Sequence, residues 1–230
     1  LIETAPKPIL IHSFDPGGSK TFDRQLIESG QIIVDSRYEG EDDKQPRAWD
    51  DWNRNFADQK RQGIFNHIAT FAIDSGTLMA EAALNKVKKS KSEGATLPEY
   101  NLRIIEFRAA IKKCLDLPCT FILTAHFDYS KDDALGKIIG GPFSGQMQSK
   151  FPLLFDEVWY LESKESSDGS RYIINTSSAS LMTPSRSRIG RGRFKASEDW
   201  TMPQNPKSDE VFGVKLLMKK AELNYKDKGV

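Results

Sequence analysis

Residues 67–76 form the stretch that most constrains how this chain folds. They run His-Ile-Ala-Thr-Phe-Ala-Ile-Asp-Ser-Gly, an apolar segment that ends in an acid, a hydroxyl and a glycine. Such a segment is typical of a central parallel strand that is buried on both faces. The carboxyl ends of these strands line the ligand crevice of an open α/β sheet. Because a bare buried carboxylate is costly, Asp74 predicts either a ligand site at the strand tip or a cap for the next helix.

The composition excludes several classes of protein. The 230 residues carry a formal net charge of +1, so no global field draws the chain to nucleic acid or membrane. Two cysteines, Cys114 and Cys119, and three histidines form neither a disulfide scaffold nor a zinc motif. No run approaches the ~20 apolar residues of a membrane span, and no secretory signal is present. We therefore expect a reducing, cytoplasmic compartment.

Alternating strand and helix patterns over the first ~125 residues predict an α/β fold with a mostly parallel sheet flanked by helices. We expect strands at 8–14, 32–35, 67–73 and 119–124, and helices at 21–29, 47–62, 76–89 and 99–117. In the helix at 47–62, three aromatic residues recur at helical spacing, and the core explains them better than base stacking. In the last helix the expected apolar stripe is Leu102, Ile105, Ile111 and Leu115.

The second half of the chain has a different pattern. Residues 127–143 are polar and predict a loop, and two antiparallel strands are expected at 155–161 and 171–176, joined by a turn at 166–169. A lysine-rich peripheral helix is expected after residue 206. We divide the chain into a core over 1–193 and a basic C-terminal extension over 194–230.

Polar residues follow three of the predicted strands, and such strand ends converge at one edge of an α/β sheet. They are Asp15, Asp74 with Ser75, and Thr124 with His126. Phosphoryl transfer requires an acid on the magnesium shell, a group that orients water and a contact to the γ-phosphate. We assign the magnesium contact, through water, to Asp74, the orientation of water to Asp15, and the γ-phosphate to His126 or Thr124. The alternatives are a simple turn at Asp15 and a strand cap at His126.

Four arginines in residues 185–193 are further candidates. Arg186 and Arg188 are assigned to nucleotide phosphates, and Arg191 and Arg193 to nucleic acid. A solvated loop and a contact to a DNA backbone are equally compatible with this cluster.

A phosphate-binding loop of the form Gly-x-x-x-x-Gly-Lys-Ser/Thr is absent from the 230 residues. Residues 17–21, Gly-Gly-Ser-Lys-Thr, approach the pattern, but Phe14 and Ser19 stand where its two glycines belong. We interpret this segment as unrelated to that loop.

Taken together, these motifs resemble phage-encoded AAA-type, RecA-like P-loop ATPases that are associated with recombination and single-strand annealing. Phe71 to Ser75 match the second acidic motif of that family. The other matching segments, in the same order and spacing, are residues 4–11, 15–18, 117–126, 155–160 and 185–188.

The resemblance implies a RecA-like P-loop NTPase core with a C-terminal antiparallel hairpin. It also implies ATP and Mg²⁺ as cofactors, single-stranded DNA as a partner, and a homo-oligomeric ring or filament in the host cytoplasm. By the family's layout, the phosphate loop lies just upstream of Leu1, so we expect the sequence to begin inside a longer product. A degenerate relative, serving only as a DNA-binding or assembly module, is the alternative.

Overall fold

A computed structural model of the chain describes residues 1–42, 44–88, 94–132, 137–143, 146–166, 169–177, 185–190, 192–201 and 210–229. The chain folds into two compact units. The sheet unit consists of Pro6–His126 together with Ile2 and Asp227–Val230. The hairpin unit consists of Phe127–Lys226 together with Leu1 and Glu3–Ala5.

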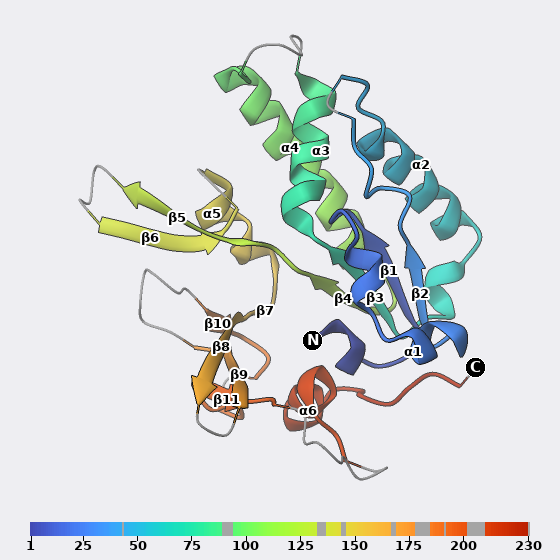
Figure 1. Ribbon diagram of the computed structural model, residues 1–230, viewed down its shortest axis with the longest axis vertical. Helices are drawn as coiled ribbons and strands as arrows, with labels where there is room; N and C mark the ends of the chain where they lie inside the picture. Colours follow the sequence, from blue (N-terminus) through green and yellow to red (C-terminus); the bar gives the residue numbers. More distant parts are fainter. Residues whose placement is uncertain are drawn as a thin grey trace. The chain divides into compact units, whose positions relative to one another are not determined.

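The sheet unit is built on four parallel strands in the order β2-β1-β3-β4 (Figure 1). They are β1 (Ile9–Ser13), β2 (Ile32–Asp35), β3 (Thr70–Asp74) and β4 (Thr120–Leu123). The two central strands are almost completely buried, as their apolar sequences predict. The mostly parallel α/β sheet expected from the sequence is therefore confirmed.

Three long helices, α2 (Ala48–Arg61), α3 (Gly76–Val87) and α4 (Leu97–Leu115), pack side by side in one layer (Figure 1). The shorter elements are η1 (Ile2–Thr4), η2 (Gly18–Thr21), α1 (Arg24–Glu28) and η3 (Ile64–Asn66). The aromatic residues predicted to face the core from α2, Trp49, Trp52 and Phe56, are all buried. They stack in series and continue through Phe56 to Phe71 of β3.

The apolar stripe predicted for α4 is wrong at three of its four positions. Only Ile111 is buried, whereas Leu102 is 43% and Ile105 is 64% exposed, and Leu115 is exposed as well. The buried face consists of Glu99, Arg103, Phe107, Ala110, Ile111 and Cys114. Its charged members explain the error, because the sequence does not show that each has a partner. The Glu99 carboxylate accepts hydrogen bonds from the Thr96 amide and hydroxyl, at 2.7 and 2.8 Å, and the Arg103 guanidinium lies over the Tyr100 ring.

The hairpin unit contains antiparallel pairs. Residues 127–132 and 137–142, predicted as part of a loop, instead form the antiparallel pair of β5 (Phe127–Asp132) and β6 (Lys137–Pro142). The predicted C-terminal hairpin is confirmed as β8 (Tyr160–Ser166) and β9 (Gly169–Asn175), although its first strand lies at 160–166 rather than at the predicted 155–161. β11 (Ser197–Asp199) joins it in a three-stranded sheet. Residues 167 and 168 of the hairpin turn lie outside the described residues. The remaining elements are α5 (Gln146–Lys150), η4 (Pro152–Leu154), β7 (Glu157–Val158) and β10 (Arg186–Ser187).

The C-terminal segment contains the expected helix, α6 (Gly213–Lys220), which buries Val214, Leu217 and Met218. Gly213 has φ +62°, and a Cβ there would lie 2.1 Å from the Thr4 hydroxyl oxygen, so this close approach requires glycine. The boundary placed at residues 193 and 194 stays a prediction. Among the described residues, no helix is long and apolar enough to cross a membrane.

His12 of β1 is a buried polar residue at the centre of the sheet unit. Its Nδ1 accepts a hydrogen bond from Trp52 Nε1 at 3.0 Å, and its ring lies edge-on to Phe71. Burial lowers the pKa of His12 from 6.5 to about 4, against a smaller opposing effect of Asp35. The folded state therefore holds this imidazole neutral at physiological pH.

We expect this neutral histidine to make the sheet unit sensitive to acid. The unfolded chain takes up a proton near pH 6.5 whereas the folded chain does so only near pH 4. The free energy of unfolding therefore falls as the pH drops through this window, by up to about 3 kcal/mol. Urea unfolding at several pH values measures the effect. His12→Asn, which keeps an acceptor for Trp52, should flatten the acid slope, whereas His67→Asn at an exposed position should not. An unchanged slope in His12→Asn would contradict this account.

Candidate functional site

The carboxyl ends of β1, β3 and β4 meet at one edge of the sheet, as expected for parallel strands. Ser13, the last residue of β1, pairs in register with Asp74, the last residue of β3. The Asp74 carbonyl oxygen accepts hydrogen bonds from the amides of Phe14 and Asp15, at 2.6 and 3.4 Å. These bonds extend the pairing beyond β1 and place Asp15 beside Asp74.

Asp74 is half-buried at the tip of β3 and has no cationic partner among the hydrogen bonds and ion pairs of the described residues. Its Oδ1 accepts a hydrogen bond from the Thr124 hydroxyl at 2.5 Å. Burial raises the pKa of Asp74, and the negative charge of Asp15 adds to this, while the Thr124 hydroxyl and His126 act in the opposite direction. The ionised form of Asp74 is therefore disfavoured unless a cation binds nearby.

Asp15 lies in the turn after β1 and connects two further predicted residues. Its Oδ1 accepts a hydrogen bond from the Ser75 hydroxyl at 2.6 Å, and its Oδ2 lies 3.2 Å from His126 Nε2. The side chain of Asp15 is 25% exposed and that of His126 is 61% exposed. A ligand that approaches this edge can therefore reach both groups.

The tip of β4 is fixed against the start of α3. The Thr124 carbonyl accepts a hydrogen bond from the Gly76 amide at 2.8 Å, and the His126 amide donates to the Thr77 hydroxyl, also at 2.8 Å. A Cβ on Gly76 would lie 2.7 Å from Leu123 Cδ1 and 3.2 Å from the Thr124 carbonyl oxygen, so the glycine permits this close approach. The structure thus brings together Asp15, Asp74, Ser75, Thr124 and His126.

The donors at this edge fit a magnesium ion better than a transition metal. Four of them are oxygen donors, two carboxylates and two hydroxyls, with the His126 imidazole beside Asp15 as the one nitrogen donor. Mg²⁺ is usually held by one or two carboxylates with the remaining ligands from water and phosphate. Within the described part of the chain, no three His, Cys, Asp or Glu residues are grouped as a metal site. The described residues therefore do not form a metal site in which the protein supplies all the ligands.

The glycine-rich turn after Asp15 binds a carboxylate of the chain itself. The Glu39 Oε2 accepts a hydrogen bond from the Gly17 amide at 3.1 Å, and Oε1 accepts one from the Ser19 amide at 2.9 Å. Glu39 was not predicted as a site residue, because one glutamate in a charged loop carries no motif. The Gly-Gly turn nearby was the available signal, since exposed backbone amides attract anions.

The four predicted arginines belong to the hairpin unit. The Arg186 Nη2 donates to the carbonyls of Pro152 and Phe155, at 2.9 and 2.7 Å, so this guanidinium helps to hold the unit together. Arg188 is 61% exposed and lies 3.3 Å from an Asp156 carboxylate oxygen. Arg193 donates to the Ala221 carbonyl and the Glu222 carboxylate, and Arg191 lies outside the described residues. Their predicted roles stay predictions.

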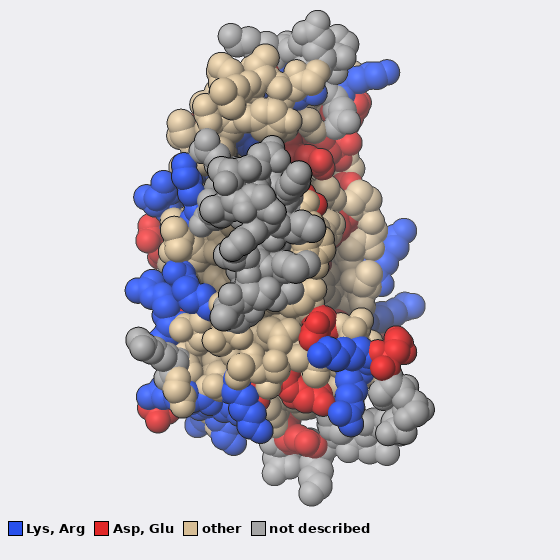
Figure 2. All heavy atoms as spheres, turned by 90° about the vertical axis from the view of Figure 1, so that its left-hand side faces the viewer, with Lys and Arg blue, Asp and Glu red and all other residues tan. Residues whose placement is uncertain are grey.

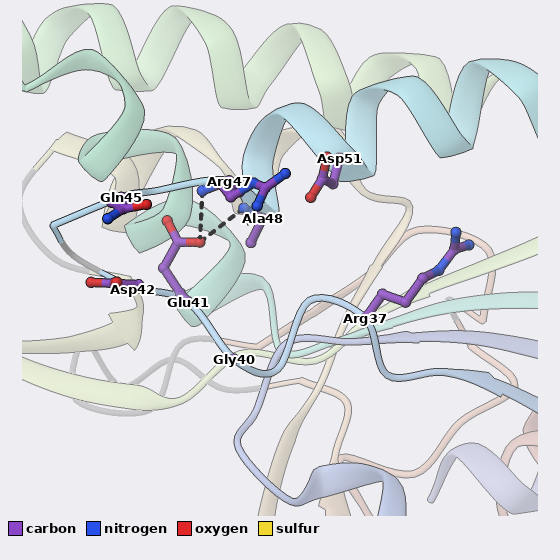
Figure 3. A pocket seen from close by; sticks show the side chains of 8 residues that line it. All are labelled: Arg37, Gly40, Glu41, Asp42, Gln45, Arg47, Ala48 and Asp51. Atoms are coloured by element: carbon purple, nitrogen blue, oxygen red, sulfur yellow. Dashed lines mark hydrogen bonds between the residues drawn. The ribbon is translucent and has the colours of Figure 1, made fainter.

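A polar cavity of about 300 Å³ lies between the loop after β2 and the start of α2 (Figure 3). Glu41 points to the start of α2, where its Oε2 accepts hydrogen bonds from the amides of Arg47 and Ala48 at 3.3 and 2.9 Å. This carboxylate therefore caps the helix. The residues that line the cavity are Arg37, Gly40, Glu41, Asp42, Gln45, Arg47, Ala48 and Asp51, and none of them is a predicted site residue.

We expect removal of the Thr124 hydroxyl to raise the pKa of Asp74 further, because this hydrogen bond stabilises the charged form. Thr124→Val removes the donor while keeping the shape of the side chain. Carboxyl-carbon NMR titration should show a higher midpoint for Asp74 in this variant. Ser75→Ala is the matched control, because Ser75 donates to Asp15 rather than to Asp74. An Asp74 midpoint that Thr124→Val leaves unchanged would disprove the contact.

Comparison with known proteins gives the family of this chain. A search of curated proteins found no match. A family model described as an AAA domain matches residues 3–189, which includes all four strands of the parallel sheet and the five residues gathered at its edge. The chain therefore belongs to the AAA domain family, a family of P-loop ATPases whose members generally bind ATP with Mg²⁺.

Proposed function

We propose that this protein binds and hydrolyses ATP as a RecA-like NTPase. The observation that carries the proposal is the pairing of Asp74 and Asp15 at the tips of neighbouring strands, with hydroxyl donors on each and His126 beside them. Two adjacent carboxylates repel one another, and a divalent cation offsets that cost while its remaining ligand positions take water and phosphate oxygens.

Each residue is assigned a role in ATP hydrolysis from its contacts at the edge of the sheet. Asp74, whose Oδ1 binds the Thr124 hydroxyl, would hold a magnesium ion through its hydration shell, and the ion would supply positive charge for the phosphates. Asp15 accepts a hydrogen bond from Ser75 and keeps its second oxygen toward His126, so it is placed to orient an attacking water. His126 and Thr124, which follow β4 and contact Asp15 and Asp74, would bind the γ-phosphate.

Asp74→Asn should abolish ATP turnover in a chain that is extended upstream to include the phosphate loop. We expect a loss of at least about 100-fold in kcat, because the amide lacks the charge that holds the cation shell. Asp58→Asn, at an exposed ion pair on α2, is the control for a simple loss of charge and should keep full activity.

Undiminished turnover in Asp74→Asn would remove Asp74 from the site. No turnover in the extended parent chain would instead favour the alternative, a non-catalytic module that serves as a DNA-binding or assembly subunit. The amides of Gly17 and Ser19 already donate hydrogen bonds to the Glu39 carboxylate and not to a phosphate, which is compatible with that alternative.

We further propose that the protein acts on single-stranded DNA, as a cytoplasmic homo-oligomer in phage recombination or replication. The support is the resemblance described above and the four arginines within residues 186–193. Acidic and basic side chains are interspersed over the face shown in Figure 2, in keeping with the net charge of +1. A DNA contact therefore depends on a local cluster rather than on the overall field.

The arginine cluster is tested by the salt dependence of binding to single-stranded DNA. Arg188→Ala should make the slope of log affinity against log salt less steep, by about the amount that one phosphate contact contributes. Arg24→Ala, at an exposed ion pair of the sheet unit, should leave the slope unchanged. Arg186 is unsuitable for this test because its guanidinium binds two backbone carbonyls of its own unit. An unaltered slope in Arg188→Ala would exclude a backbone contact at that residue.

A further inference from the structure

Two glutamates, Glu39 and Glu41, fix the loop that connects β2 to α2, residues 36–47, to other parts of the sheet unit. Each uses its carboxylate to accept hydrogen bonds from two backbone amides. Glu39 binds the amides of Gly17 and Ser19, and Glu41 binds the amides of Arg47 and Ala48. The two contacts are alike in chemistry but fix different parts of the fold.

The amides that Glu39 binds belong to the turn that starts at Asp15. The Gly18 amide donates to the Asp15 carbonyl at 2.8 Å, and Gly17 has φ +75°. A Cβ on Gly18 would lie 3.1 Å from the Ser13 hydroxyl oxygen and 3.2 Å from Asp15 Cβ. The turn is therefore folded tightly against Asp15, and a shift at Gly17 or Ser19 displaces the Asp15 side chain.

Glu39 is charged at neutral pH, which strengthens its hold on the turn. Burial alone would raise the pKa of Glu39. The nearby hydroxyls of Ser13 and Ser19, together with the hydrogen bonds from the Gly17 and Ser19 amides, outweigh burial and lower the pKa of Glu39 below its usual value. Hydrogen bonds from amides to an ionised carboxylate are roughly twice as strong as neutral ones.

We propose that Glu39 is a positioning residue for Asp15. Its carboxylate clamps the turn after β1 so that Asp15 keeps one oxygen on the Ser75 hydroxyl and the other near His126. The effect on catalysis rests on the proposed ATPase function, whereas the effect on the Asp15–His126 contact does not.

In the chain extended upstream, Glu39→Ala should lower kcat for ATP by about tenfold or more while KM changes little, because a small displacement of a reacting group is costly. Glu41→Ala is the matched control, since it removes the same type of carboxylate clamp from the same loop without touching the turn of Asp15. It should lower stability and leave kcat near that of the parent. Glu39→Gln keeps one carbonyl acceptor and should retain an intermediate kcat.

A double-mutant cycle separates positioning from a general loss of structure. If Glu39 acts through Asp15, Asp15→Asn with Glu39→Ala should be no slower than Asp15→Asn alone. The proposal would be overturned if the kcat losses of Asp15→Asn and Glu39→Ala multiplied in the double variant. Equal kcat values in Glu39→Ala and Glu41→Ala would overturn it as well.

A second measurement does not depend on turnover. In the 230-residue chain, Glu39→Ala should speed hydrogen exchange at the Gly17 and Ser19 amides and shift the NMR resonances of the His126 ring. Glu41→Ala should do neither. His126 resonances that stay in place in Glu39→Ala would refute the proposal, even if the extended chain hydrolyses ATP.

Discussion

The cost of burying the Asp74 carboxylate beside a second carboxylate, at the edge of a parallel sheet, is the constraint on which the candidate site depends. Asp15 and Asp74 are placed together by backbone hydrogen bonds from the amides of Phe14 and Asp15 to the Asp74 carbonyl. One hydroxyl donor on each carboxylate, from Ser75 and Thr124, offsets part of the cost. Burial, with the negative charge of Asp15 as a smaller contribution, still raises the pKa of Asp74. A site with this balance favours the binding of a cation.

Backbone amides provide the second organising interaction of the sheet unit. Glu39 and Glu41 lie two residues apart in one loop and each binds a pair of amides, one in the turn after β1 and one at the start of α2. Through these contacts a loop without helix or strand in its described residues connects the edge of the sheet to the start of α2, the helix that carries Trp49, Trp52 and Phe56. The same loop therefore links the stability of the core to the geometry of the site.

The features that follow from local pattern were predictable, and the features that depend on distant partners were not. The apolar runs of β1 and β3 and the spacing of Trp49, Trp52 and Phe56 determine burial directly, so the parallel sheet and α2 were found. The face of α4 was misjudged because Arg103 is buried with partners at Tyr100 and Glu81, while Ile105 is left exposed. The β5–β6 hairpin was missed because its strands are rich in polar residues and glycine, which resemble a loop.

The candidate site shows the same division. Asp15, Asp74, Ser75, Thr124 and His126 were identified because residues that follow parallel strands converge by topology. Glu39 was missed because its partners, the amides of Gly17 and Ser19, have no side-chain signature and lie about 20 residues away in sequence. Contacts between side chains and backbone amides are therefore the part of this site that only the structure reveals.

The most direct test of the cation site uses Mn²⁺ in place of Mg²⁺, with ATP and the chain extended upstream. Paramagnetic broadening of amide resonances reports which residues lie near the ion. The account predicts that broadening is strongest at Asp15, Asp74, Ser75, Thr124 and His126. Broadening centred on the acidic residues around the cavity, Glu41, Asp42 and Asp51, with the resonances of Asp15 and Asp74 unaffected, would contradict it.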